Sequence, residues 1–171
     1  GSPRSLTNER LRKGIRAGMS LAIQIPTGGS PQMRLRNPPK AGIARWAPAF
    51  LKLPVLSIRQ PWAWLVVNGL KDIENRTWRT HYRGQILIHA SANLKDLTWD
   101  ERERCESLGG AKMPEDYDVG GVIGIVEIVD CVRRHRSVWK HGPSWGWVLA
   151  DACPLRFREC KGAVGFFYPT W

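Results

Sequence analysis

The chain has 171 residues, of which 43% are hydrophobic and nine are tryptophan, and its formal net charge is +11 at pH 7. This length and apolar content fit one domain with a sizeable core and exclude a chain that is disordered throughout. No apolar run approaches the ~20 residues that a membrane-spanning helix needs. The basic N-terminus lacks the apolar segment of a secretory signal. We therefore expect a cytoplasmic protein that has no membrane partner.

Much of the positive charge is concentrated near the N-terminus. Residues 1–50 contain nine of the 26 Lys and Arg residues and one acid, Glu9, which leaves 17 basic and 14 acidic residues for 51–171. Prolines and glycines between 26 and 42 are typical of a linker. We divide the chain into an irregular, basic N-terminal extension (1–50) and a folded domain (51–171). The extension is either an arm attracted to phosphates or a solubilising leader, and its Trp46 and Phe50 are expected to pack against the domain.

The first half of the domain predicts short elements. A strand over 55–58 is followed by a helix that Pro61 opens and Gly69 ends. A second strand is expected over 71–78. Simple alternation puts Glu74 and Arg76 on one face of it and Lys71 on the other, unless Lys71 still lies in the turn.

The second half predicts longer strands. After a strand over 85–91, Thr98 or Asp96 can cap a charged helix that runs to about 107. Residues 121–132 are apolar on both faces, which indicates a central strand buried on both sides. Three more strands are expected over 145–151, 155–158 and 164–167, with Pro154 and a turn at Lys161-Gly162 between them. About six strands and two short helices predict an α+β, mostly β fold, either a barrel or a curled sheet.

The spacing of the cysteines and histidines does not indicate a metal or cofactor site. No two of the four cysteines form a CxxC pair, and the four histidines have no metal-ligand spacing, so we expect no metal and no cofactor. His89 lies in an apolar strand, where a hydrogen-bonded core histidine is favoured over a role in a site.

A dense polar cluster between residues 71 and 79 is the candidate site. Lys71 and Arg76 can hold a phosphate or bond a base edge, and Glu74 can accept from an exocyclic amine. The alternative is that Glu74 and Arg76 form an ordinary ion pair on a sheet, worth ~1 kcal/mol or less.

Further binding residues are expected to flank this cluster. Backbone N–H groups at the strand-to-helix turn can bind an anion, and aromatic rings can stack unpaired bases at ~1–3 kcal/mol each. The residues of this flanking set are Ser57, Arg59, Gln60, Trp62, Trp78, Arg79, Tyr82 and Arg83.

Several blocks of the sequence resemble one family. The stretch SIRQPWAWLVVNGLKDIENRTWRT, the later YRGQILIHAS, GGVIGIVEIVDC after PEDYDVGG, and the ending WGWVLADACPLRFRECKGAVGFF are similar to the activating-signal-cointegrator homology (ASCH) family. Its motif G-x-K-x-x-E-x-R appears here as Gly69, Lys71, Glu74 and Arg76. The resemblance covers about 53–168.

The resemblance implies a PUA-like six-stranded β-barrel with a few short flanking helices. It also implies a cleft between barrel and helices, lined by the motif residues. Related domains bind RNA, DNA or modified bases. Some members hydrolyse acylated cytidine and carry threonine where this chain has Asp72 and Glu74, and a ribonuclease activity also occurs in the family.

These features predict a nucleic-acid-binding module that recognises RNA or a modified nucleotide in its cleft, with single-stranded nucleic acid or a modified base favoured. The first alternative is a metal-independent hydrolase, a ribonuclease or an N4-acylcytidine amidohydrolase, that uses Lys71 and Glu74 as an acid–base pair. The second is a protein-interaction domain of a regulatory complex.

Overall fold

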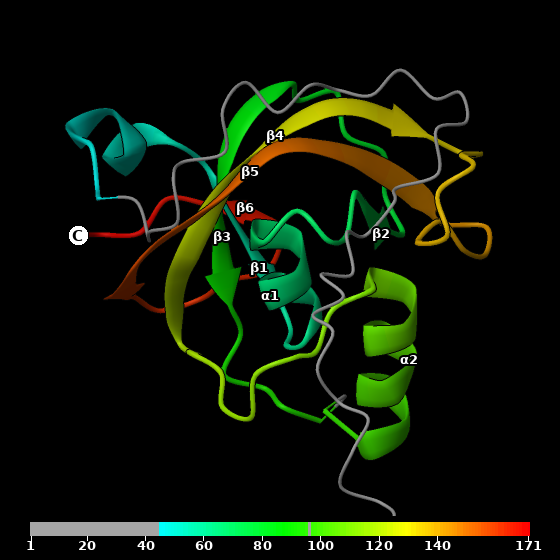
Figure 1. Ribbon diagram of the computed structural model, residues 1–171. Coiled ribbons are helices and arrows are strands. Elements are labelled where there is room, and N and C mark those ends of the chain that lie inside the picture. The colour runs from blue at the N-terminus through cyan, green and yellow to red at the C-terminus, as the bar shows by residue number, and fades with distance from the viewer. Residues whose placement is uncertain (1–44, 96) are drawn as a thin grey trace, which may run out of the picture. The chain divides into compact units, whose positions relative to one another are not determined.

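A computed structural model describes residues 45–171 of the chain except residue 96 (Figure 1). Residues 1–44 of the expected N-terminal extension lie outside this described part. Six strands form one sheet in the order β2-β5-β4-β3-β1-β6. The strands are β1 (Val55–Ile58), β2 (Ile73–Arg76), β3 (Gly84–Ala90), β4 (Gly121–Val132), β5 (Trp145–Glu159) and β6 (Phe166–Phe167).

The helices end where local sequence signals predict. Helix α1 (Trp62–Val67) is followed by Gly69 in the left-handed conformation, with φ +71°, which favours glycine. Helix α2 (Trp99–Gly109) begins after Thr98, whose hydroxyl accepts a hydrogen bond from the Glu101 N–H at 3.2 Å. A short 3₁₀ helix (Pro48–Lys52) precedes β1. Both expected helices are confirmed, and Asp96, the alternative cap, is not among the described residues.

Helix α1 packs against the concave face of the curled sheet (Figure 1). Ala63, Val66 and Val67 of this helix share a buried cluster with side chains from β1, β3, β4 and β5. Because successive strand residues point to opposite faces, Val55 and Leu87 lie on the other face, in a second buried cluster. The expected mostly β fold with a six-stranded curled sheet and short helices is confirmed.

Strand β4 lies in the middle of the sheet between β3 and β5, as its apolar sequence predicts. The expectation of separate strands over 145–151 and 155–158 is wrong, because β5 runs unbroken through both. Pro154 pairs with Gly124 where the β4–β5 register shifts. A proline is tolerated at such an irregularity because the ladder hydrogen bonds are already disrupted there.

The segment before β1 packs on the second cluster, as expected for Trp46 and Phe50. The Trp46 indole N–H donates to the Arg156 carbonyl oxygen at 2.7 Å, and its ring meets that of Trp171 edge-on with centroids 5.1 Å apart. The Arg158 guanidinium lies over both rings, at 5.3 and 4.6 Å. Residues from both ends of the described chain therefore cover one face of the sheet.

Gly124 provides the close contact between α1 and β4. A Cβ atom at this position would lie 2.3 Å from Val67 Cγ1 and 2.9 Å from the Cys153 carbonyl oxygen. Overpacking of this kind typically costs about 1–3 kcal/mol.

We expect Gly124→Ala to lower the free energy of unfolding by about that amount in urea denaturation. In the double variant Gly124→Ala/Val67→Ala the cost should be smaller than the sum of the two single costs, and strict additivity would contradict this account.

Candidate functional site

Two cations flank the Glu74 carboxylate at the start of β2. Lys71 Nζ lies 2.8 Å from Glu74 Oε2 and also donates to the Ile73 carbonyl oxygen. Arg76 Nε lies 3.1 Å from Glu74 Oε1, but its N–H is not aimed at the oxygen, so this contact is an ion pair without a hydrogen bond. Lys71 lies in the turn before β2 and reaches Glu74 from there. Strand alternation, which would put the two side chains on opposite faces, therefore does not apply to Lys71.

The pair between Lys71 and Glu74 is buried, with residue exposures of 5% and 8%. Burial raises the pKa of the Glu74 carboxyl, but the charges of Lys71 and Arg76 and the Lys71 hydrogen bond outweigh it, so the pKa is lowered. Glu74 is therefore ionised at neutral pH. A buried carboxylate is stable in this state only while its counter-charges remain in place.

Arg76 connects the charged cluster of Lys71, Glu74 and Arg76 to a strand on the other side of the curled sheet. Its Nη2 donates to the Ser57 carbonyl oxygen at 2.8 Å. Strand β6 pairs with β1 only at Val55 and Leu56, so the guanidinium reaches β1 beyond the last pair. A side-chain contact thus joins β2, at one edge of the sheet, to β1 near the other.

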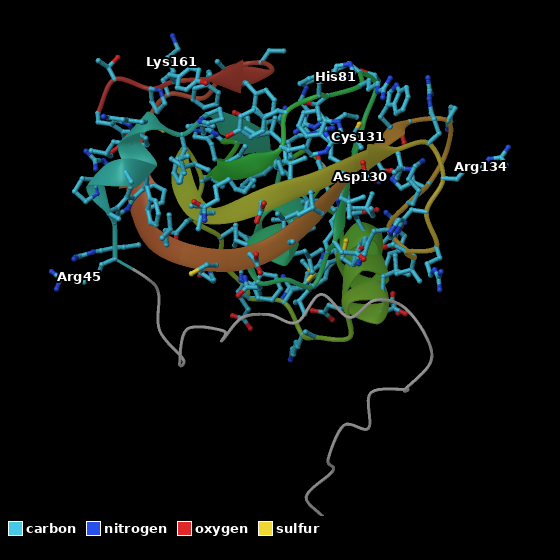
Figure 2. All side chains as sticks on the ribbon, turned by 90° about the horizontal axis from the view of Figure 1, so that it is seen from above. Arg45, His81, Asp130, Cys131, Arg134 and Lys161 are labelled. Atoms are coloured by element: carbon cyan, nitrogen blue, oxygen red, sulfur yellow. The ribbon has the colours of Figure 1, made fainter. Side chains whose placement is uncertain are left out.

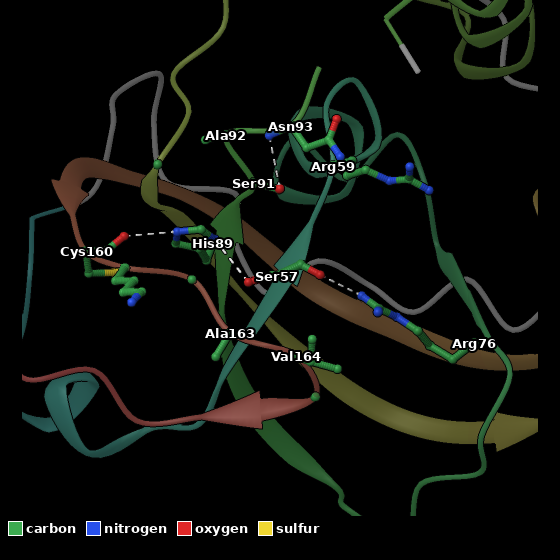
Figure 3. A pocket seen from close by; sticks show the side chains of 14 residues that line it. Ser57, Arg59, Arg76, His89, Ser91, Ala92, Asn93, Cys160, Ala163 and Val164 are labelled. Carbon is green, nitrogen blue, oxygen red and sulfur yellow. Dashed lines mark hydrogen bonds between the residues drawn. The ribbon is translucent and has the colours of Figure 1, made fainter. Parts of the chain in front are cut away.

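A pocket of about 580 Å³ opens beside Arg76 (Figure 3). Its lining comes from the ends of β1, β2 and β3, from Gly120, and from the segment between β5 and β6. The lining residues are Ser57, Arg59, Arg76, His89, Ser91, Ala92, Asn93, Gly120, Cys160, Lys161, Gly162, Ala163, Val164 and Gly165. Three of these are cations, and none is an acid.

Three groups form a line of hydrogen bonds along the pocket wall (Figure 3). Ser57 and His89 are direct partners in the parallel β1–β3 register. Ser57 Oγ lies 3.1 Å from His89 Nδ1, and His89 Nε2 lies 3.1 Å from the Cys160 carbonyl oxygen. Burial lowers the pKa of the His89 imidazole despite the bond to Cys160, so the ring is neutral at pH 7.

Gly162 covers this line closely. A Cβ atom on Gly162 would lie 2.5 Å from His89 Cε1 and 3.0 Å from Ser57 Oγ. Only a glycine lets the segment between β5 and β6 approach the Ser57–His89 pair this closely without displacing it.

The structure brings three of the predicted residues, Ser57, Arg59 and Arg76, into the pocket lining. Lys71 and Glu74 lie behind Arg76, outside the lining. Gln60 is 1% exposed and serves the fold, because its amide accepts from the Trp64 N–H and donates to the Asp118 carbonyl oxygen. Trp62 lies under the Arg59 guanidinium, 5.9 Å from its ring centroid.

The remaining predicted residues are not part of the pocket lining. Trp78 and Tyr82 pack their rings against Phe166, at centroid distances of 5.8 and 5.4 Å. Arg83 pairs with Asp130 at 2.9 Å on the surface. Arg79 lies over the Trp145 ring at 5.3 Å, and Arg133 lies at 4.0 Å from the same ring.

The sequence did not point to Lys161 and its neighbours as site residues. The Lys161-Gly162 turn was visible, but nothing local indicated that it would meet the ends of β1 and β3. His89 is a buried, hydrogen-bonded histidine, as favoured, and it also lines the pocket. Its partner Ser57 lies 32 residues earlier, on β1, so no local pattern in the sequence pairs the two side chains.

A model of the ASCH domain matches residues 56–152, more than half of the chain. The chain belongs to the ASCH domain family. Activating signal cointegrator 1 of Homo sapiens is 37% identical over 85 residues, which cover 46% of this chain and 14% of that protein. The Mus musculus protein of the same name is 36% identical over 83 residues, with the same coverage. The chain thus matches about one seventh of the length of these relatives.

ASCH domains are PUA-like modules, and the motif of this one has two distinct roles. Lys71 and Glu74 stabilise the turn between α1 and β2, whereas Arg76 reaches the pocket. Asp72 accepts a hydrogen bond from Ser137 Oγ. Among the described residues, no three His, Cys, Asp or Glu side chains are grouped to hold a metal ion, and no helix could cross a membrane.

Replacing Glu74 should be costly. In Glu74→Gln the Lys71 ammonium stays buried without a counter-charge, and breaking a buried pair typically costs about 3–5 kcal/mol. The matched control is Glu101→Gln, which removes an ion pair with the more exposed Arg104 and should cost about 1 kcal/mol or less. Urea denaturation of both variants measures the difference, and equal costs would refute the structural role of Glu74.

The buried His89 should make stability depend on pH. Because its folded pKa lies below the unfolded value of about 6.5, the unfolded state binds the proton first as the pH falls. The free energy of unfolding should therefore decrease below about pH 6.5 until the folded pKa is passed. His89→Asn should lose this dependence, and the exposed-site control His135→Asn should keep it. A wild-type protein whose stability is flat between neutral pH and pH ~5 would contradict the expectation.

Proposed function

We propose that this ASCH domain binds single-stranded nucleic acid and places one nucleotide in the pocket beside Arg76. The observation that carries the proposal is the pocket itself: its charged lining residues are the cations Arg59, Arg76 and Lys161. Its volume lies within the ordinary range for small-ligand sites. A cationic pocket of this size suits a phosphorylated ligand.

The three cations differ in exposure, because Arg76 is half-buried whereas Arg59 and Lys161 are exposed. The Arg76 guanidinium is fixed between Glu74 and the Ser57 carbonyl oxygen, so it presents its charge in one place. Arg59 and Lys161 are exposed, and the Arg59 guanidinium lies over the Trp62 ring. One fixed cation and two exposed cations suit a ligand that carries negative charge.

A second basic region lies away from the pocket. The segment 133–141 contains Arg133, Arg134, Arg136 and Lys140 and no acid. Figure 2 shows Arg134 and Lys161 at well-separated places on the described domain. Phosphate contacts at both places suit an extended strand better than an isolated nucleotide.

Hydrolysis by Lys71 and Glu74 has no comparable support. These two side chains are bonded to each other, and neither lines the pocket. Lys71 directs two of its three ammonium protons at Glu74 and at the Ile73 carbonyl oxygen.

Binding should depend on salt and on Lys161. We expect the full chain to bind a labelled single-stranded RNA with an affinity that falls steeply between ~50 and ~200 mM salt. Lys161→Ala should weaken binding and reduce the slope of log K against log salt by about 0.7, the value for one phosphate contact on a single strand. Fluorescence anisotropy measures both quantities.

The control is Lys112→Ala, which removes an exposed lysine outside the pocket lining and should leave the affinity and the slope near the wild-type values. A salt-insensitive affinity, or equal losses in the two variants, would overturn the proposed function.

A further inference from the structure

The direction of the hydrogen bonds at the pocket wall is fixed by one acceptor. The Cys160 carbonyl oxygen can only accept, so the His89 Nε2 atom that lies 3.1 Å from it must carry the proton. In the neutral ring Nδ1 is then unprotonated and can only accept. The Ser57 hydroxyl therefore donates its proton to His89 Nδ1 at 3.1 Å.

This direction decides what Ser57 can offer a ligand. With its proton committed to His89, Ser57 Oγ presents lone pairs to the pocket and acts as an acceptor. Ser91, in the same lining, differs: its oxygen accepts from the Asn93 N–H at 3.2 Å, and its proton is not committed to an imidazole. Ser57 can therefore only accept a hydrogen bond from a ligand, because the tautomer of His89 fixes the direction of its own bond. Ser91 can either donate to a ligand or accept from it.

We propose that Ser57 is a specificity-determining residue that selects nucleotides whose base carries an exocyclic amino group, such as cytosine, over those with a carbonyl there, such as uracil. An amino group would donate to Ser57 Oγ. A carbonyl oxygen would face its lone pairs and leave both groups unsatisfied in a partly buried site. This inference rests on the proposed function, because it names the kind of nucleotide that the same pocket takes.

The arrangement of the pocket favours a base, and not a phosphate, next to Ser57. His89 is 3% exposed, so the Ser57–His89 pair belongs to the covered part of the pocket, under Gly162. The exposed cations Arg59 and Lys161 lie at the rim. A phosphate is better placed near these cations than against a serine oxygen that presents lone pairs.

The test compares labelled oligocytidine and oligouridine RNA of equal length, bound to the full chain at neutral pH and measured by fluorescence anisotropy. Cytosine and uracil differ at C4, an amino group against a carbonyl oxygen, and at the adjacent N3, an acceptor against an N–H donor, so the change in the ratio of the two dissociation constants in Ser57→Ala is what assigns the selection to Ser57. We expect the wild-type chain to prefer oligocytidine about tenfold. Ser57→Ala should reduce this preference to less than about twofold, and the control variant Ser107→Ala, at an exposed serine outside the pocket lining, should keep it.

The tautomer of His89 is measured separately by two-bond ¹H–¹⁵N correlation spectra of the free protein. We expect a protonated Nε2 and an unprotonated Nδ1. A protonated Nδ1, or binding of both RNAs with a ratio near one, would overturn the inference and leave the proposed function standing. A preference that survives in Ser57→Ala would do the same. If neither RNA binds, both this inference and the proposed function are overturned.

Discussion

The Glu74 carboxylate, held between Lys71 and Arg76, is the constraint on which the site depends. It fixes the Lys71 side chain across the turn that follows α1, and it orients the guanidinium that reaches the Ser57 carbonyl oxygen. The ladder of the sheet does not join β2 to β1, so this charged group supplies the link.

Local features of the chain were predictable because they depend on neighbours in sequence. Gly69 ends α1 and Thr98 begins α2 because backbone conformation and capping are decided within a few residues. The central position of β4 followed from an apolar pattern on both faces. The break predicted at Pro154 failed for a tertiary reason, since the irregular pairing with Gly124 on β4 removes the penalty that proline normally brings.

The site was harder to predict because its parts come from distant segments. The motif contains Arg76, which lines the pocket, but it could not show that the side chains of Lys71 and Glu74 would bond to each other. Ser57 and His89 face each other only because β1 and β3 pair in parallel with that register. Lys161 joins them because β5 continues past Pro154 and delivers the next segment to the same place.

The order of strands also bears on how the chain folds. Within the described part of the chain, β2 pairs with β5 alone, which is synthesised about seventy residues later, and β1 must wait for β6 to pair its outer edge. Contacts between residues so far apart in sequence first cost the conformational entropy of closing a large loop. This cost precedes the stabilisation that the contacts give, so it slows folding. Until β5 emerges, β4 presents an apolar edge to the surrounding solution. Chains that stop before Trp145 should for this reason associate with one another through β4 instead of folding.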